Sequence, residues 1–200
     1  MKSRKKKEFN SYIPLLVFIL VLLIGLILVF TIVLGKTDES YRNDHLNELD
    51  YVLDDNIYYK NVTNNTMDDF YNKKSDSFLE YKYEVDSNTF YETKLDYINN
   101  VTSSLIFRYI LNDNLIRATY ELSTTNSNVI IEGNYNEQNN SISCNIESSN
   151  NYNSTNIDSY CNIISNNIED FKKERDNFIN DSKFTSILQK ESSEVVIGDE

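Results

Sequence analysis

Residues 78–98 read FLEYKYEVDSNTFYETKLDYI, two stretches in which apolar and charged side chains alternate around a short polar turn. Successive side chains of a β-strand point to opposite faces, so a period of two is typical of a strand with one face in a core and the other in water. The pattern predicts an antiparallel hairpin with its turn at residues 86–88. In the second strand we expect Tyr91 and Leu95 on the core side and Glu92 on the wet side.

Four further segments downstream show the same alternation. Short polar turns separate them, and they read LIFRYIL, LIRATYEL, NVIIEGNY and SISCNIE at residues 105–111, 115–122, 128–135 and 141–147. Antiparallel strands joined by short turns commonly have one packed face and one solvated face. The six segments together predict a six-strand antiparallel meander.

A helix is expected on each side of this meander in the sequence. Before it, apolar residues recur at steps of three and four from Asp38 through residue 59, with His45 on the apolar side, which predicts an amphipathic helix. After it, residues 154–179 carry an apolar stripe at helical spacing, typical of a C-terminal helix packed on the sheet. The stripe consists of Ile157, Tyr160, Cys161, Ile164, Ile168, Phe171 and Phe178. The predicted fold class is therefore α+β.

An uncharged apolar stretch precedes these elements. Residues 13–34 read IPLLVFILVLLIGLILVFTIVL. A helix of this length rises roughly 30 Å, the thickness of the hydrocarbon core of a bilayer. The stretch predicts a transmembrane helix, an uncleaved signal anchor whose partner is the lipid bilayer. A cleaved signal peptide is the alternative, although its apolar part is usually about 7–15 residues long and is followed by small residues.

Charge is divided unevenly on the two sides of this stretch. Residues 1–12 carry five basic side chains and one acidic one, a sum of +4, whereas the whole chain carries −12, so the remainder carries −16. The positive-inside rule predicts a single-pass plasma-membrane protein with a cytoplasmic segment at 1–12 and an extracytoplasmic α+β domain at 35–189. Residues 190–200 are predicted to form a disordered acidic tail. An acidic domain repels nucleic acid, which excludes it as a partner.

The two cysteines, Cys144 and Cys161, both fall on faces assigned to the core, one on the last strand and one on the following helix. Outside the cytoplasm, cysteines become oxidised. We therefore predict a Cys144–Cys161 disulfide that ties the helix to the sheet. Two buried thiols that pack as small apolar side chains are the alternative. A catalytic redox pair needs a C-x-x-C spacing, which the sequence lacks.

The sequence offers no recognisable site for a metal or a cofactor. One His and two Cys cannot supply a zinc site of the usual spacing. The acidic turns lack the residue order of an EF-hand loop, and four scattered glycines do not form a phosphate-binding loop. No G-x-S-x-G motif for a serine nucleophile occurs. We therefore expect no cofactor and no metal.

Paired carboxylates are the remaining route to an enzyme, because two of them suffice for glycoside hydrolysis. The acidic residues that could gather on one face of the sheet are Glu80, Glu84, Glu92 and Asp96. Lysines lie between them in the sequence, which points instead to cross-strand ion pairs on a solvated face. A small carboxylate-dependent cell-wall hydrolase is therefore the alternative function and not the preferred one.

Several tyrosines lie outside the core pattern, in predicted loops or at the ends of elements. They are Tyr58, Tyr59, Tyr71 and Tyr152. Exposed tyrosine is favoured at protein interfaces. Together with the lack of a catalytic constellation, this favours a non-enzymatic protein-interaction subunit of an envelope assembly, whose partner is another envelope protein. An extracytoplasmic ligand-binding domain is a further alternative.

Overall fold

The computed structural model describes residues 17–25, 37–111, 113–150, 156–179 and 182–198. The chain divides into two compact units, residues 1–43 and residues 44–200. In the first unit, residues 17–25 are helical. The large apolar side chains from residue 17 to residue 24 are each between 46% and 63% exposed.

The structure covers only part of the predicted anchor. Residues 13–16 and 26–34 lie outside the described residues, as does the basic segment at 1–12. Within the described ranges, no helix is long and apolar enough to cross a membrane.

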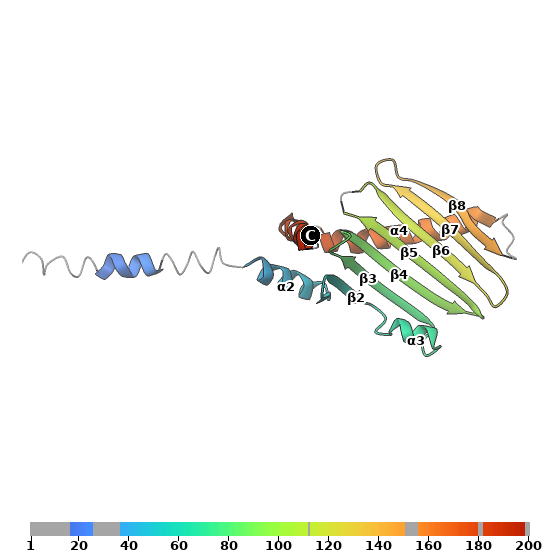
Figure 1. The fold of residues 1–200 in the computed structure, drawn as a ribbon, viewed down its shortest axis with the longest axis horizontal. Helices are drawn as coiled ribbons and strands as arrows, with labels where there is room; N and C mark the ends of the chain where they lie inside the picture. Colours follow the sequence, from blue (N-terminus) through green and yellow to red (C-terminus); the bar gives the residue numbers. More distant parts are fainter. Residues whose placement is uncertain (1–16, 26–36, 112, 151–155, 180–181, 199–200) are drawn as a thin grey trace, which may run out of the picture. The chain divides into compact units, whose positions relative to one another are not determined.

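The second unit is built on one antiparallel sheet whose strand order follows the sequence (Figure 1). Its eight strands are β1 (Val52–Asp54), β2 (Ile57–Asn61), β3 (Ser77–Glu84), β4 (Thr89–Ile98), β5 (Val101–Ile110), β6 (Leu115–Ser123), β7 (Asn128–Asn136) and β8 (Ser141–Asn150). The α+β class with an antiparallel sheet is confirmed, and the six predicted strands are present as β3–β8. The predicted number of strands is wrong, because two more precede them.

The two additional strands replace the second half of the predicted first helix. Helix α2 (Asp38–Glu48) ends well before residue 59. Asp50 and Asp55 have positive φ angles of 61° and 49°, which the right-handed helix excludes. Asp and Asn adopt this conformation more readily than other side chains, so Asp55 turns the chain into a hairpin in which Val52 pairs with Tyr59.

Helix α4 (Ile157–Ile179) crosses one face of the sheet, behind the strands in Figure 1. It contacts β6, β7 and β8, where a cross-strand row of small residues comprises Ala118, Gly133 and Cys144. A β-carbon added at Gly133 would lie 3.0 Å from Cδ1 of Ile164 on the helix. The small row therefore lets the helix approach the sheet closely on this side.

Aromatic side chains fill the wider space between α4 and the strands nearer β3. The ring of Phe171 lies 5.0 Å from that of Phe107, and the ring of Phe178 lies 5.3 Å from that of Phe90. All four side chains are at most 1% exposed. The main core therefore lies between α4 and the sheet, as the apolar stripe of the sequence predicted.

The opposite face of the sheet is covered at one corner by the short helix α3 (Met67–Tyr71). Its Phe70 packs with Leu95 in a second, smaller buried cluster. Strand β4 is therefore inverted relative to the sequence prediction: Leu95 and Tyr91 face the α3 side, and Glu92 faces α4. Alternation along a strand shows which residues share a face, but it does not show which face is buried. In β4 both faces are partly buried, one by α3 and the other by α4.

Helix α5 (Ser182–Gly198) follows α4, and its Phe184 and Leu188 are buried within the second unit. The sequence predicted a disordered tail at residues 190–200, whereas the helix continues to Gly198. Its buried apolar residues anchor the start of the helix, and the Gln, Lys and Glu residues that follow have good helix propensity. Residues 199–200 lie outside the described part of the chain.

Candidate functional site

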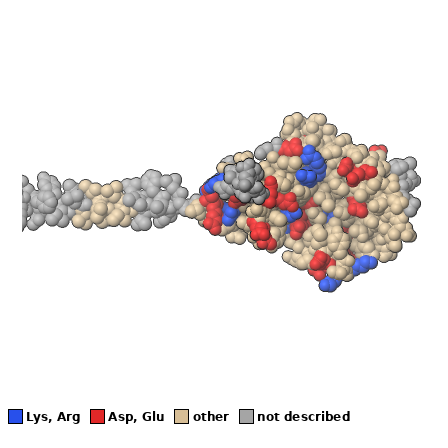
Figure 2. Space-filling model, viewed as in Figure 1, with Lys and Arg blue, Asp and Glu red and all other residues tan. Residues whose placement is uncertain are grey.

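The face of the sheet opposite α4 is the one that α3 covers only at its corner. Figure 2, drawn from the same side as Figure 1, shows it as largely uncharged with isolated basic and acidic groups. One row of cross-strand partners runs over it from β3 to β7, and cross-strand partners share a face. The row consists of Lys82, Tyr91, Arg108, Arg117 and Asn134. We call this side the open face.

A first hollow of about 390 Å³ lies on the open face over β5, β6 and β7. Its lining residues are Tyr91, Ile106, Arg108, Arg117, Ala118, Thr119, Glu132, Gly133 and Asn134. Two guanidinium groups and several neutral hydrogen-bonding groups therefore border one cavity, together with one carboxylate. That carboxylate, on Glu132, accepts a hydrogen bond from Nδ2 of Asn145 on β8 at 3.4 Å.

The two arginines of this hollow are direct cross-strand partners on β5 and β6. Arg117 reaches Asp113, with Nη1 3.3 Å from Oδ2. Arg108 makes no ion pair or side-chain hydrogen bond within the described residues. Like charges placed directly opposite each other destabilise a sheet. The pair is therefore a local cost in stability, which the Asp113 carboxylate offsets only at Arg117.

A buried arginine elsewhere in the domain, Arg175, has its charge fully paired, unlike Arg108. Arg175 of α4 is 5% exposed, forms a two-pronged ion pair with Glu137 at 2.9 Å for each nitrogen, and lies 4.3 Å over the ring of Tyr109. Asp176 accepts two further hydrogen bonds from it. These contacts hold the pKa of Arg175 above its usual value despite its burial. Such a fully paired arginine serves the packing of α4, in contrast to Arg108.

A second hollow, of about 430 Å³, continues along β5 and β6 toward α3. It shares Ile106 with the first, and its other lining residues are Phe70, Tyr71, Leu95, Thr102, Ser104, Glu121 and Ser123. Ile106 is 36% exposed and Tyr71 is 66% exposed. The two hollows therefore form one track along the open face, charged at one end and mostly neutral at the other.

The four carboxylates considered for hydrolysis do not gather on one face. Glu80 and Glu84 on β3 share the open face with Lys82, and Lys82 binds Glu84 at 2.6 Å. Glu92 and Asp96 on β4 face the α4 side. The prediction that all four could lie together is wrong, because β4 is inverted relative to the sequence interpretation.

Glu92 is instead a buried carboxylate between the sheet and α4, 3% exposed. Its Oε2 has no hydrogen-bond partner in the described part of the chain. Burial raises its pKa to about 7, and the nearby carboxylates of Asp170 and Glu174 on α4 add to the rise, while Lys94 and the Tyr81 hydroxyl oppose it. Glu92 therefore carries a proton for part of the time near neutral pH.

The groups around Glu92 are held by contacts between the strands and α4. Glu174 accepts from Nζ of Lys60 at 2.9 Å and from the Tyr51 hydroxyl at 3.1 Å. Lys94 donates to Oδ1 of Asn167 at 3.2 Å. Among the described residues, no group of three or more His, Cys, Asp or Glu side chains could hold a metal ion. The polar cluster is a packing contact and not an open site.

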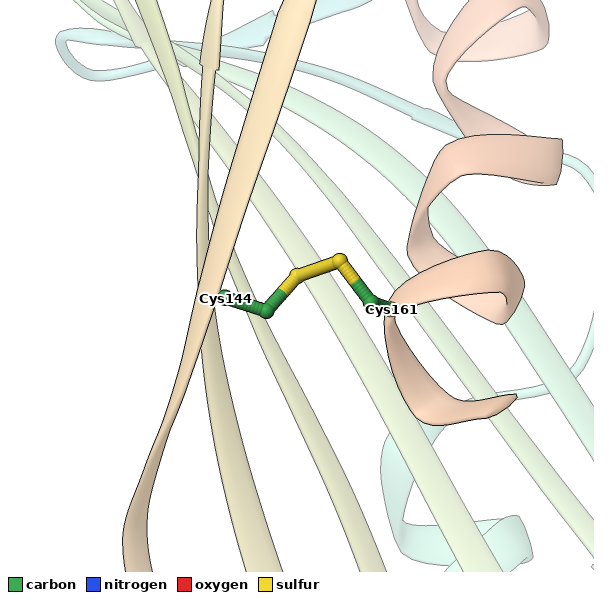
Figure 3. The surroundings of a disulfide bond; sticks show 2 residues. All are labelled: Cys144 and Cys161. Atoms are coloured by element: carbon green, nitrogen blue, oxygen red, sulfur yellow. A yellow bond between two sulfur atoms is a disulfide. The ribbon is translucent and has the colours of Figure 1, made fainter. Parts of the chain in front are cut away.

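The structure brings Cys144 of β8 and Cys161 of α4 together as a disulfide, with Cα atoms 5.9 Å apart (Figure 3). Figure 3 shows the bond bridging the gap between the outermost strand and the first turns of the helix. β8 pairs on one side only, with β7. The covalent link therefore fastens an edge strand to the helix that covers the core.

The interface tyrosines and the single histidine occupy different environments. Tyr71 is exposed at the second hollow, as the interface hypothesis requires. Tyr58 lies on β2 and is completely buried, so its interpretation as an exposed interface residue is wrong. Tyr152 lies outside the described residues. His45 packs 4.3 Å from the ring of Phe184 and donates from Nε2 to the carbonyl of Phe178, so it is a packed residue.

The chain matches no protein-family profile, no curated protein and no solved structure. Its function must therefore be argued from the open face itself. The sequence analysis did not single out Arg108 and Arg117. Their pairing could have been predicted from the sequence. A hairpin with its turn at residues 111–114 places Arg108 and Arg117 opposite each other.

Proposed function

We propose that residues 13–34 anchor this chain in a membrane and that the α+β domain outside it binds a partner protein through the open face, without catalysing a reaction. The observation that carries the proposal is the pair of adjacent hollows on β5 and β6, which share Ile106 as a lining residue. Aromatic residues and arginines are enriched at protein interfaces, and both border this track.

An extended segment of the partner is the occupant that suits the track. From Arg108 to Ser104, four residues along β5, the track covers about 13 Å, because a strand rises about 3.3 Å per residue. Alternate side chains of an extended segment point to one side, so they can fill the two hollows in succession. A hydrolase needs its two carboxylates around one substrate. Glu80 and Glu92 lie on opposite faces of the sheet, which disfavours this alternative.

The anchor is supported by the sequence and by the exposure of the helical residues within it. A run of exposed apolar side chains is typical of contact with lipid or with another protein. The length of the uncharged stretch and the basic residues before it favour lipid, with the domain on the outer side. The disulfide is consistent with that location.

Photocrosslinking in native membranes tests this function. A photoreactive amino acid replaces Ile106 or Tyr71 on the track, or Lys173 on the exposed side of α4, in the full-length protein. We expect the two track positions to give the same defined crosslinked partner and the Lys173 position to give none of it. Ile106→Glu should abolish the crosslink from the Tyr71 position. Equal crosslinking from all three positions, or none from the track, would contradict the proposal.

A further inference from the structure

We propose that Arg108 and Arg117 form a subsite for the carboxylate of an acidic residue in an extended peptide segment of the partner. The inference deepens the proposed function and rests on it, because it names the chemistry that the charged end of the track recognises. Its first support is that Arg108, which lies directly opposite Arg117, makes no ion pair within the described residues, while Asp113 contacts only Nη1 of Arg117. Two arginines directly opposite each other are a cost that a bound anion would remove.

The geometry of the first hollow suits a carboxylate. Both side chains border the same cavity, and a guanidinium offers two parallel N–H donors that match the two oxygens of a carboxylate. Asp113 occupies only Nη1 of Arg117, which leaves the other donors of that group for a ligand. Tyr91 and Thr119 add hydroxyl groups to the rim.

The acidic group within the hollow does not block the subsite. Glu132 is the only carboxylate among the lining residues, and it forms no ion pair with either arginine. Its hydrogen bond from Asn145 turns it toward β8, away from β5. The hollow is bordered by two guanidinium groups and one carboxylate, and that carboxylate lies on the side of β8. The net charge on the Arg108 side of the hollow is therefore positive.

The surroundings favour a peptide carboxylate over a polyanion. The chain beyond residue 12 carries a net charge of −16, which repels a long polyanion as a whole. Toward Ser104 the track is lined by hydroxyl and apolar groups, with Glu121 the only ionisable one. A segment with one acidic side chain at the Arg108 end and neutral or apolar side chains beyond it complements this order.

The strand spacing sets the pattern of such a segment. The acidic residue over Arg108 and the side chain over Ser104 are about 13 Å apart, which is four residues of an extended peptide. The residue between them, two positions from each, lies over Ile106. We therefore infer an acidic residue followed or preceded by apolar residues at the second and fourth positions.

Peptide binding to the full-length protein in lipid nanodiscs tests this subsite. The probes are two pools of fluorescent six-residue peptides with Leu, Ile or Val at the second and fourth positions from a fixed Asp, in both chain directions. The matched pools carry Asn in place of Asp. Binding is followed by fluorescence anisotropy. We expect the Asp pools to bind at least tenfold more tightly than the Asn pools.

Charge-removing variants locate the effect. Arg108→Gln and Arg117→Gln should each abolish the preference for Asp, so that the Asp pools bind no more tightly than the Asn pools. Lys173→Gln, which removes the same charge from the exposed side of α4, should leave the preference intact. Thermal unfolding checks the fold, and Arg108→Gln should be at least as stable as the parent because it removes the like-charge pair.

Several outcomes would overturn the subsite. Equal binding of the Asp and Asn pools that is sensitive to Ile106→Glu would remove the subsite and leave the proposed function standing. No binding of any pool, together with loss of the position-specific crosslinks, would remove both. A preference for Asp that Lys173→Gln also abolishes would indicate general attraction. Displacement by inorganic phosphate at lower concentration than by acetate would assign the pair to phosphate instead of to a carboxylate.

Discussion

At the scale of single residues, two charged groups occupy unusual environments, and they do so for different reasons. Arg108 is exposed on the open face opposite a second arginine, which is a feature of the surface. Glu92 belongs with Lys94 and Asp96 to the charged set of β4 and yet lies in the main core. Its position follows from the inversion of β4, since Leu95 must reach the second cluster beneath α3.

The burial of Glu92 makes the stability of the domain dependent on pH. Its pKa rises from the ordinary 4.5 to about 7 in the folded protein, so the fold binds this proton more tightly than the unfolded chain does. The stabilisation is fully present below about pH 4.5 and is lost as the pH rises through 7. The difference amounts to at most about 3 kcal/mol.

Glu92→Gln should therefore raise the free energy of unfolding at pH 8 by up to about 3 kcal/mol and flatten its change between pH 5 and pH 8. Urea unfolding at several pH values measures both. Glu169→Gln removes the same charge from the exposed side of α4 and should change the free energy by less than about 0.5 kcal/mol. If the two variants behave alike, burial of Glu92 is not the cause.

At the scale of helices and strands, the period of two sufficed to locate β3–β8 and the spacing of three and four sufficed for α4. Both signals are local and survive in any context. The hairpin β1–β2 was not predicted because its apolar residues also fit a helical spacing. The turn depends on the positive φ angle of Asp55, which the apolar spacing does not reveal. The inverted face of β4 could not be predicted, because it depends on Phe70, which is distant in the sequence from Leu95.

The second cluster can be tested through helix α3. Phe70→Ala should lower the free energy of unfolding by about 3–5 kcal/mol, because it removes a buried ring from contact with Leu95 and leaves a cavity. Tyr71→Ala removes a neighbouring ring that is 66% exposed and should cost less than about 0.5 kcal/mol. Denaturant unfolding gives both values. Equal losses would mean that α3 does not cover the sheet as described.

The disulfide acts between two secondary-structure elements, because it joins β8 to α4 across 17 residues of chain. Closing a loop of this length stabilises a protein by about 3 kcal/mol, chiefly by restricting the unfolded state. A Cys144→Ser, Cys161→Ser double variant should lose that amount in urea unfolding, and a reductant should destabilise the parent but not the variant. Two titratable thiols in the denatured, unreduced parent would contradict the bond.

At the scale of the whole molecule, the two ends of the chain carry opposite charge on either side of an apolar stretch. The open face, the disulfide and the acidic surface each belong to the second unit, and their proposed roles presuppose that this unit lies outside the cytoplasm. The proposed subsite on Arg108 and Arg117 would meet a partner in the envelope only with that orientation. The orientation of the chain is therefore the premise that connects its separate features.

Charge reversal across the anchor tests that premise. Replacing the basic residues of segment 1–12 by Gln, together with Asp38→Lys and Glu39→Lys beyond the apolar stretch, moves the positive charge from one side of that stretch to the other. By the positive-inside rule this exchange should reverse the proposed orientation. We expect the domain of the parent to be cleaved by protease added to intact cells, and a large fraction of the variant to be protected.

The cysteines provide an independent readout of the same inversion. The cytoplasm keeps thiols reduced, so protected molecules of the variant should carry free Cys144 and Cys161, whereas molecules of the parent should carry the disulfide. Gel mobility after alkylation separates the two states. Asp38→Asn with Glu39→Gln serves as the matched control and should retain the orientation of the parent, because acidic residues contribute little to the rule. A parent protected from protease with reduced cysteines would place the domain in the cytoplasm and remove the basis for an envelope partner.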